Sequence, residues 1–219
     1  MTKQPHNVVL VDDHVLLRDA LASYLDKYDE IKVSGVACNG EELLESLKQG
    51  PRPELIVLDL NMPKMDGYET AALLKARHPE IHVLVLTMYD SEIALIRLLQ
   101  VGVRGFLKKD IHPGELRAAI IAIVENGYYY SHNATGKLAS LFRKDAHNQN
   151  SIEKAMLSVT EIEFLRFAST DMTYKEIAGK MRITPRAIDG YRDALFDKLD
   201  VKSRVGLAIY AVKNGIVVF

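Results

Sequence analysis

The sequence is poor in cysteine and lacks long apolar runs. Cys38 is the only cysteine, so no disulfide can form within the chain. We expect its thiol to fill space in a strand rather than to perform redox chemistry. No apolar run reaches the roughly 18 residues that a membrane-spanning helix needs. The opening residues, MTKQPHNVVLVDDH, lack the apolar segment and cleavage site of a secretory signal. These absences predict a cytoplasmic protein with no membrane partner.

A strong net charge is also absent, because the 219 residues carry a formal charge of −1. Residues 1–154 contain 18 Lys and Arg against 21 Asp and Glu, a net charge of −3. Residues 155–219 contain 10 against 8, a net charge of +2. The C-terminal part is therefore slightly basic, which weakly favours nucleic-acid binding. The length suggests two small domains rather than one large one.

Apolar runs alternate with amphipathic segments up to about residue 126. Most of the runs are rich in Val, Ile and Leu, as expected of strands buried on both faces; they cover 7–13, 31–38, 54–60, 82–88 and 103–109. The amphipathic segments cover 14–28, 40–49, 66–77, 91–101 and 113–126. Asn39 with Glu42, and Pro113, are helix-start signals. Five such β-then-α units predict an α/β doubly wound five-stranded parallel sheet with helices on both faces, in a domain of residues 1–130.

The C-terminal part has a different pattern. Residues 131–155 are polar and irregular, with one short helical candidate near 134–143, and we interpret them as a linker. Residues 156–219 are predicted to form a small all-α domain with helices near 161–169, 174–181, 186–199 and 203–213. The start signals are Thr160 with Glu163, Thr173 with Glu176, Thr184-Pro185 and Ser203, and Asn214-Gly215 ends the last helix. Four short helices with the interruption MRITP predict a helix-turn-helix.

Polar side chains follow the ends of the predicted strands. Asp12 and Asp13 end the first strand, Asp59 the third and Thr87 the fourth, and Lys109 follows the fifth. In a doubly wound sheet these ends form the functional crevice. Converging carboxylates repel one another, and Mg²⁺ with its preference for oxygen ligands relieves this repulsion. A carboxylate beside Mg²⁺, a lysine and a hydroxyl is suited to accept a phosphoryl group. The plainer alternative, ordinary loop residues, fits any one of the five better than all five together.

The stretches VDDH, LDLNMPKMDG, LTMYD and GVRGFLKKD resemble the motifs of bacterial response-regulator receiver domains, over about residues 5–127. The resemblance implies that a sensor histidine kinase phosphorylates Asp59. It implies that Mg²⁺ is bound by Asp12, Asp13, Asp59 and the backbone carbonyl of Asn61. Thr87 and Lys109 are then implied to contact the phosphoryl group.

The same resemblance implies a switch formed by Thr87 and Phe106. On phosphorylation Thr87 would move toward the phosphate and the aromatic ring would turn inward. The spacing from Gly105-Phe106 favours Lys109 over Lys108 as the phosphate-contacting lysine. Asn61 and Tyr89 occupy positions that tune the lifetime of the phosphoryl group in this family.

An enzyme with turnover is the competing interpretation of the carboxylate site. Aspartyl-phosphate phosphatases also use a strand-end Asp with Mg²⁺, but they carry a second Asp two residues later. Here that position is Asn61, which cannot act as a carboxylic acid. We therefore expect no enzyme but a phosphoacceptor regulator, limited to self-phosphotransfer and slow autodephosphorylation. The histidines show no metal-ligand spacing, and His14 is interpreted as a loop residue.

The C-terminal part resembles the NarL/LuxR-type helix-turn-helix of response regulators over about residues 156–216. The matching stretches are LSVTEIEFLRF, TYKEIAGKMRIT, AIDGYRDALFDKLDVKSR and GLAIYAVKNGIV. The resemblance implies a two-component regulator of transcription that binds double-stranded DNA. In the family the last helix makes the dimer contact of the DNA-bound form, so a homodimer is implied when the protein is phosphorylated.

The helix RAIDGYRDALFDKL is acidic where a DNA-reading helix is expected. At roughly 100° per residue, a buried stripe is predicted for Ile188, Tyr191, Leu195 and Leu199, and an outward face for Arg186, Asp189, Gly190, Asp193 and Asp197. In the family, positions 189, 190 and 193 project into the major groove and are often basic or small. The pattern Val-Lys-x-His of the family is altered here at Asp189 and Tyr191.

Two functions remain open for this acidic helix. Asp189 or Asp193 can accept a hydrogen bond from the amino group of cytosine, with Gly190 allowing close approach. Phosphate contacts would then come from Lys175, Lys180, Arg182, Arg186, Arg192, Lys202 and Arg204. Alternatively the acidic face repels DNA, and the output domain acts through protein–protein contact. The scaffold and the flanking basic residues favour DNA binding.

Overall fold

The computed structural model describes residues 4–88, 92–131, 135–136 and 157–217. The chain divides into two compact units, which are described separately: the first holds residues 1–90 and 97–136, and the second holds residues 91–96 and 137–219. Most of the predicted linker, residues 131–155, lies outside the described residues, and so does most of the helical candidate near 134–143 within it. Tyr89 also lies outside the described residues.

The first unit contains a parallel sheet in the strand order β2-β1-β3-β4-β5-β6. Its strands are β1 (His6–Val11), β2 (Ile31–Ala37), β3 (Leu55–Asp59), β4 (His82–Thr87), β5 (Gly105–Lys108) and β6 (Tyr129–Tyr130). The central strands are buried on both faces, since all five residues of β3 are buried. Because the strands are parallel, the carboxyl ends of β1, β3, β4 and β5 lie at one edge of the sheet.

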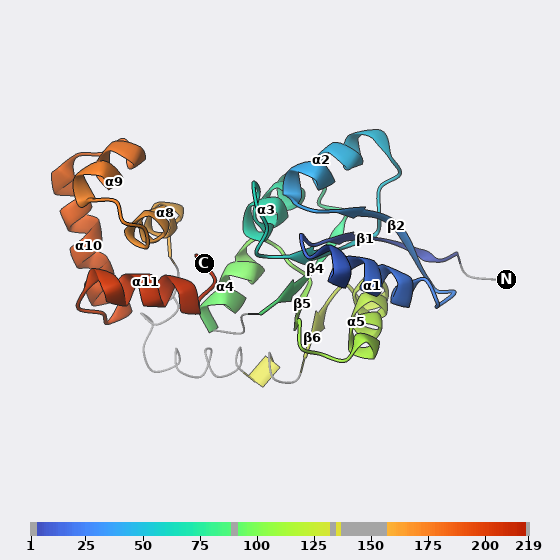
Figure 1. The fold of residues 1–219 in the computed structure, drawn as a ribbon. Coiled ribbons are helices and arrows are strands. Elements are labelled where there is room, and N and C mark those ends of the chain that lie inside the picture. The colour runs from blue at the N-terminus through green and yellow to red at the C-terminus, as the bar shows by residue number, and fades with distance from the viewer. Residues whose placement is uncertain (1–3, 89–91, 132–134, 137–156, 218–219) are drawn as a thin grey trace. The chain divides into compact units, whose positions relative to one another are not determined.

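Helices cover both faces of the sheet, as predicted (Figure 1). Leu25 of α1 (Val15–Leu25) and Leu116 of α5 (Pro113–Asn126) join one apolar cluster with Val8, Leu55 and Leu84 of the strands. The opposite face carries α2 (Gly40–Gln49) and α3 (Gly67–Arg77). Helix α4 (Glu92–Gln100) follows β4 in the chain. The predicted start signals are confirmed, because the Asn39 side chain accepts a hydrogen bond from the Glu42 N–H at 3.0 Å and Pro113 begins α5.

A short sixth strand extends the five that were predicted. Tyr129 and Tyr130 pair in parallel with Gly105 and Phe106 of β5. The rings of Phe106 and Tyr130 lie 6.0 Å apart. A Cβ at Gly105 would lie 2.7 Å from the Tyr129 carbonyl oxygen, so the pairing requires glycine there. The chain that leaves the first unit thus begins on the edge of β5.

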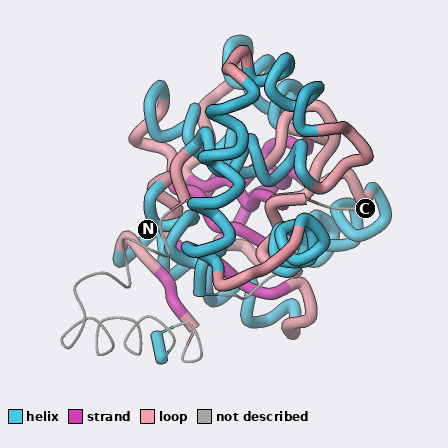
Figure 2. The backbone as a smooth tube through the Cα atoms, turned by 90° about the vertical axis from the view of Figure 1, so that its left-hand side faces the viewer, coloured by secondary structure: helices cyan, strands magenta, loops and turns pink. Residues whose placement is uncertain are grey.

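The described part of the second unit is helical, with α8 (Val159–Ala168), α9 (Tyr174–Met181), α10 (Pro185–Leu199) and α11 (Arg204–Lys213). In Figure 2 helices are cyan and the strands, which belong to the sheet of the first unit, are magenta. Its core is built around Phe164, Leu165, Ile188, Leu195 and Leu207, none of which is exposed. Arg182 adopts φ 54° at the end of α9, which turns the chain into α10 and confirms the predicted helix-turn-helix.

One predicted helix start was wrong by two residues. Ser158, not Thr160, caps α8: its hydroxyl accepts the Glu161 N–H and the Glu161 side chain accepts the Ser158 N–H. The sequence LSVTEIE contains both Ser158–Glu161 and Thr160–Glu163 at the spacing of a capping box. The Glu161 side chain of the first pair also binds the Lys198 ammonium of α10 at 2.8 Å. The caps predicted at Thr173, Thr184 and Ser203 are confirmed.

Candidate functional site

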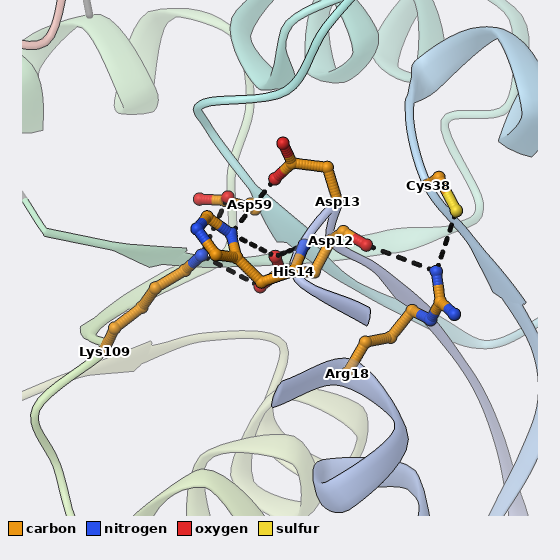
Figure 3. A network of polar contacts seen from close by, with 7 residues as sticks. All are labelled: Asp12, Asp13, His14, Arg18, Cys38, Asp59 and Lys109. Carbon is orange, nitrogen blue, oxygen red and sulfur yellow. Dashed lines mark hydrogen bonds and ion pairs between the residues drawn. The ribbon is translucent and has the colours of Figure 1, made fainter. Parts of the chain in front are cut away.

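The strand ends bring together the polar residues singled out from the sequence. Asp12 follows β1, Asp59 ends β3, Thr87 ends β4 and Lys109 follows β5. The Lys109 ammonium lies 2.9 Å from Asp12 Oδ2 and 2.8 Å from Asp59 Oδ2 (Figure 3). Asp12 and Asp59 are 5% and 2% exposed. Two carboxylates and one lysine thus share a site largely withdrawn from water.

Lys109 and Lys108 have different surroundings. Lys109 is directed into the carboxylate cluster, whereas Lys108 pairs at 3.3 Å with Asp110, whose side chain is 63% exposed. Successive residues of a strand point to opposite sides, which separates the two lysines. The geometry accordingly gives Lys109 the position expected of the phosphate-contacting lysine.

Burial controls the acid–base behaviour of this cluster. Burial raises the pKa of Asp59 above its usual value, although the neighbouring Lys109 ammonium acts in the opposite direction. Burial also works against the charge of Lys109, but the carboxylates of Asp59 and Asp12 outweigh it, and the pKa of Lys109 is raised. Lys109 therefore remains a cation that can meet an incoming anion.

The donor set fits a hard divalent cation. Ligand atoms of Asp12, Asp13, His14 and Asp59 all lie within 4.8 Å of one another. Among the described residues, Lys109 is the side chain that pairs with the buried Asp59 carboxylate, at 2.8 Å from Oδ2. Clustered carboxylates with unused lone pairs are the oxygen ligands that Mg²⁺ prefers. Asn61, whose carbonyl was expected among the ligands, is half-buried two residues after Asp59.

His14 lies inside this cluster, although it was expected to be an ordinary loop residue. Its Nδ1 is 3.1 Å from Asp12 Oδ1 and 3.1 Å from Asp13 Oδ1, and its backbone N–H donates to Asp12 Oδ1 at 2.9 Å. The His14 side chain is 67% exposed, so it covers the carboxylates from the solvent side. Its position directly after Asp12-Asp13 was the available signal.

Arg18 is a second residue that the sequence did not single out. It is 7% exposed, and Figure 3 shows its guanidinium between the Asp12 backbone and Cys38. Nη1 donates to Cys38 Sγ at 2.9 Å and to the Asp12 carbonyl oxygen at 3.4 Å. Nε and Nη2 donate to Asp19 Oδ1. Arg18 thereby links the loop that carries Asp12 to the end of β2.

The proposed switch residues are both buried. Thr87 is 0% and Phe106 is 5% exposed. The Lys109 N–H donates to the Thr87 carbonyl oxygen at 2.9 Å, so β4 and β5 are held together at the site itself. On the neighbouring loop, a Cβ at Gly67 would lie 2.2 Å from the Asp59 carbonyl oxygen. Only glycine lets α3 begin so close to the backbone of Asp59.

The outward face predicted for α10 is confirmed. Exposed residues on it are Arg186, Asp189, Gly190, Asp193 and Asp197, whereas Ile188 and Leu195 are buried. The other predicted DNA contacts are also exposed at Lys175, Lys180, Arg182 and Lys202. The face lies on a helix that follows a tight turn from α9, as in a DNA-reading helix-turn-helix.

Arg192 and Arg204, also predicted to contact DNA, are half-buried and bound within the unit. Arg204 donates from Nε to the Ala168 carbonyl oxygen at 2.9 Å and from Nη2 to that of Thr170 at 2.7 Å. Arg192 donates from Nη1 to Asp189 Oδ1 at 3.1 Å and from Nε to Asp193 Oδ1 at 2.9 Å. The predicted acidic face therefore contains a cation between two of its carboxylates.

Comparison with known families accounts for both units. Residues 8–121 match the family described as "Response regulator receiver domain". Residues 155–211 match the family described as "Bacterial regulatory proteins, luxR family". The chain belongs to the NarL/LuxR-type response regulators. A response regulator of this type joins a receiver domain to a DNA-binding domain.

Relatives of this response regulator cover nearly its whole length. It is 30% identical over 210 residues to "Response regulator GacA" of Pseudomonas viridiflava, covering 96% of this chain and 97% of the relative. It is 29% identical over 218 residues to "Transcriptional regulatory protein LnrK" of Bacillus subtilis (strain 168), covering 97% and 99%. Both relatives are named as regulators.

A solved structure shares the fold of this response regulator. It is RcsB from Salmonella enterica serovar Typhimurium bound to promoter rprA in the presence of phosphomimetic BeF3-. The TM-score is 0.69 at 23% identity, covering 94% of this chain and 98% of that chain. In the part of the chain that the structure describes, no helix combines the length and apolar character needed to cross a membrane.

Proposed function

We propose that Asp59 is the phosphoacceptor of this response regulator and that a sensor histidine kinase supplies the phosphoryl group. The observation that carries the proposal is the pairing of buried Asp59 with Lys109, 2.8 Å away, at the carboxyl ends of the central strands. A carboxylate oxygen of Asp59 forms a bond to phosphorus, and the bond from phosphorus to the donor nitrogen breaks. Lys109 then pairs with the new phosphoryl oxygens, and the Thr87 hydroxyl approaches them.

Asp12, Asp13, Asp59 and the carbonyl of Asn61 are proposed to hold Mg²⁺. When bound, this ion supplies positive charge that offsets the carboxylates and the entering phosphoryl oxygens. His14 covers this group of ligands, and Arg18 holds the Asp12 backbone through its carbonyl oxygen. Both residues would position the loop on which two of the ligands lie.

Phosphorylation is proposed to act through Thr87 and Phe106. A phosphoryl group at Asp59 replaces a single carboxylate charge by about two negative charges with three acceptor oxygens. Thr87 would follow these oxygens, and the space it leaves would admit the ring of Phe106. Because Phe106 lies beside Tyr130, the change reaches β6 and the chain that leads to the helical unit.

The output is proposed to be operator binding by the helical unit as a homodimer, with an effect on transcription in the cytoplasm. Exposed cations around α9 and α10 supply phosphate contacts, and the outward face of α10 supplies base contacts. The alternative, an output through protein contact, rested on repulsion by the aspartates of α10. The pairing of Arg192 with Asp189 and Asp193 weakens that objection.

The protein is proposed to be a regulator that carries the phosphoryl group rather than an enzyme that turns over. Asn61 stands where phosphatases of the aspartyl-phosphate type carry an acid. Hydrolysis of the acyl phosphate would then be slow, because no carboxylic acid at that position assists the attacking water.

The test uses the full chain with Mg²⁺ and acetyl phosphate as donor. We expect the wild type to take up one phosphoryl group. We expect Asp59→Asn to remain folded but to take up no phosphoryl group on the same timescale. Selection from a random duplex DNA pool, with and without donor, should enrich a motif more strongly with donor. Phosphate uptake by Asp59→Asn at the wild-type rate would show that the site is wrong; failure to enrich any duplex would show that the output is not DNA.

A further inference from the structure

The acidic face of α10 contains an ordered cluster of three charged side chains. Arg192 Nη1 lies 3.1 Å from Asp189 Oδ1, while Nε and Nη2 each lie 2.9 Å from Asp193 Oδ1. The two aspartates are 57% and 65% exposed, and Arg192 is 29% exposed. Charge-assisted contacts from both sides fix the plane of the guanidinium.

An aromatic stack supports the same guanidinium from within the unit. Arg192 Cζ lies 5.6 Å from the centre of the Tyr174 ring. Tyr174 stacks on Phe164 with ring centres 6.3 Å apart and planes 3° from parallel. Phe164 is fully buried and also stacks on Tyr191 of α10. A cation within about 6 Å of a ring is attracted to its face, so Arg192 rests on a ring anchored in the core.

The donor inventory of Arg192 leaves a defined pair of N–H groups. A guanidinium has five N–H donors. Asp193 accepts one N–H from Nε and one from Nη2, and Asp189 accepts one N–H from Nη1. Among the described contacts, one N–H on Nη1 and one on Nη2 have no acceptor. Guanine presents two acceptors, O6 and N7, at its major-groove edge, and arginine contacts them with two parallel hydrogen bonds.

We propose that Arg192 is a specificity-determining residue that binds guanine in the major groove, and that Asp189 and Asp193 are positioning residues for it. This inference rests on the proposed DNA-binding function. It assigns Arg192 to a base rather than to a phosphate, and it assigns the two aspartates to Arg192 rather than to cytosine. Two of the acidic residues of α10 are then present because they hold Arg192 in position.

Two physical effects favour this assignment. A long arginine side chain loses rotamer freedom when it binds, and a guanidinium already held in place loses less of it. The cluster of Arg192, Asp189 and Asp193 also has a formal charge of −1, so it is poorly suited to attract a phosphate. Attraction to the DNA backbone is left to exposed residues outside the cluster, namely Lys175, Lys180, Arg182, Arg186 and Lys202.

The test begins with a motif selected from random duplex DNA by the full chain treated with acetyl phosphate. Each guanine of the motif is then replaced in turn by 7-deazaguanine, which lacks the N7 acceptor but keeps Watson–Crick pairing. For the wild type we expect one guanine in each half-site at which this replacement lowers affinity by about 5-fold to about 150-fold. For Arg192→Ala the same replacement should have no effect, because the contact is already lost.

Two further sets of variants test the arginine and its support. Arg192→Lys keeps the charge but cannot form the two parallel bonds, so it should also lose the guanine preference. Asp189→Asn and Asp193→Asn should relax the preference at that guanine although they remove negative charge from the DNA-facing side. The matched control is Asp197→Asn, an exposed aspartate on the same helix, which should leave the preference unchanged.

Several results would overturn the inference while leaving DNA binding intact. One is an equal loss of affinity for all duplexes in Arg192→Ala, with the salt slope reduced by about 1, which is the signature of a phosphate contact. Another is a base preference that depends on Asp189 or Asp193 at a pair where 7-deazaguanine has no effect. Absence of any enriched motif for the wild type would instead refute the proposed DNA binding itself, and the inference with it.

Discussion

At the scale of single residues, two cations of this molecule each lie between two carboxylates. Lys109 lies between Asp12 and Asp59, and Arg192 between Asp189 and Asp193. In the receiver site the balance is incomplete, because three carboxylates face a single lysine. The remaining negative charge is what a divalent cation would neutralise.

Binding of Mg²⁺ should therefore stabilise the receiver. At a concentration 100 times the dissociation constant, we expect about 2.7 kcal/mol of added stability against unfolding. Asp13→Asn should abolish most of this gain, since it removes one ligand that is not held by Lys109. Thermal unfolding with and without Mg²⁺ measures both, and Asp29→Asn, an exposed aspartate outside the group of ligands, is the control. An equal Mg²⁺ effect in Asp13→Asn would contradict the ligand set.

A pH prediction follows from Glu161. Burial opposes its ionisation, but Lys198, 2.8 Å away, and the Ser158 N–H outweigh this and lower the pKa of Glu161 below its usual value. A lowered carboxyl pKa stabilises the fold above that value, and the stabilisation is lost as the pH falls through the folded-state pKa. Glu161→Gln keeps the capping-box geometry but loses the ion pair. Its stability deficit should be largest near neutral pH and should vanish in acid.

The measurement is the unfolding of the helical unit against pH, followed by NMR signals of Leu165 and Leu195. Glu163→Gln serves as the matched variant, because Glu163 is an exposed residue of the same helix. A deficit in Glu161→Gln that stays constant from neutral pH into acid would mean that the Lys198 pair does not contribute.

At the scale of elements, Gly190 lowers the stability of helix α10, because glycine is a poor helix former. A Cβ at Gly190 would meet nothing within 4 Å, so the unit itself does not require glycine there. Gly190→Ala should stabilise the helical unit by about 1 kcal/mol. It should at the same time weaken DNA binding, because the added methyl group lies on the outward face of α10.

Gly179→Ala is the control for this substitution. Gly179 lies in α9 and its Cβ would also meet nothing within 4 Å, so a similar gain in stability is expected without loss of DNA affinity. Chemical denaturation and DNA titration measure the two quantities separately. Unchanged DNA affinity in Gly190→Ala would indicate that this part of α10 does not approach the DNA.

Most elements were predictable because local signals and periodicity agreed. The helix predicted at 174–181 and those at 40–49 and 113–126 have the predicted bounds. The cap of α8 was not predictable from spacing alone, since Ser158–Glu161 and Thr160–Glu163 both have the spacing of a capping box. Strand β6 has two residues and no periodicity, and it exists only because β5 offers an edge at Gly105 and Phe106.

The site was predictable where it depended on strand order and not where it depended on side-chain reach. Asp12, Asp59, Thr87 and Lys109 were found because parallel strands end at one edge. The contacts of Arg18 with Cys38, and of Arg192 with its two aspartates, depend on the conformations of long side chains. No spacing rule specifies those conformations.

At the scale of the whole molecule, the proposed function couples phosphorylation to association and to DNA affinity. Val205 and Ile209 of α11 are 67% and 51% exposed, although they are apolar. We expect acetyl phosphate to shift the full chain toward a dimer and to raise operator affinity. Ile209→Glu should weaken dimeric DNA binding while leaving phosphate uptake unchanged.

Analytical ultracentrifugation and DNA titration of the same samples test this prediction. Val159→Glu changes another exposed apolar residue of the helical unit, 84% exposed, and should have no such effect. Equal loss in both variants would mean that surface charge, rather than a dimer contact on α11, is responsible.

The two residues of β6 also have a mechanical consequence. Any tension along the chain between the receiver and the helical unit is transmitted through Tyr129 and Tyr130, whose backbone is held by β5 at Gly105 and Phe106. Because only two residue pairs attach β6, we expect it to separate from β5 before the longer strands separate from one another. A molecule stretched from its two ends should therefore lengthen by a small, reversible step before the sheet yields. That step would directly alter the surroundings of Phe106.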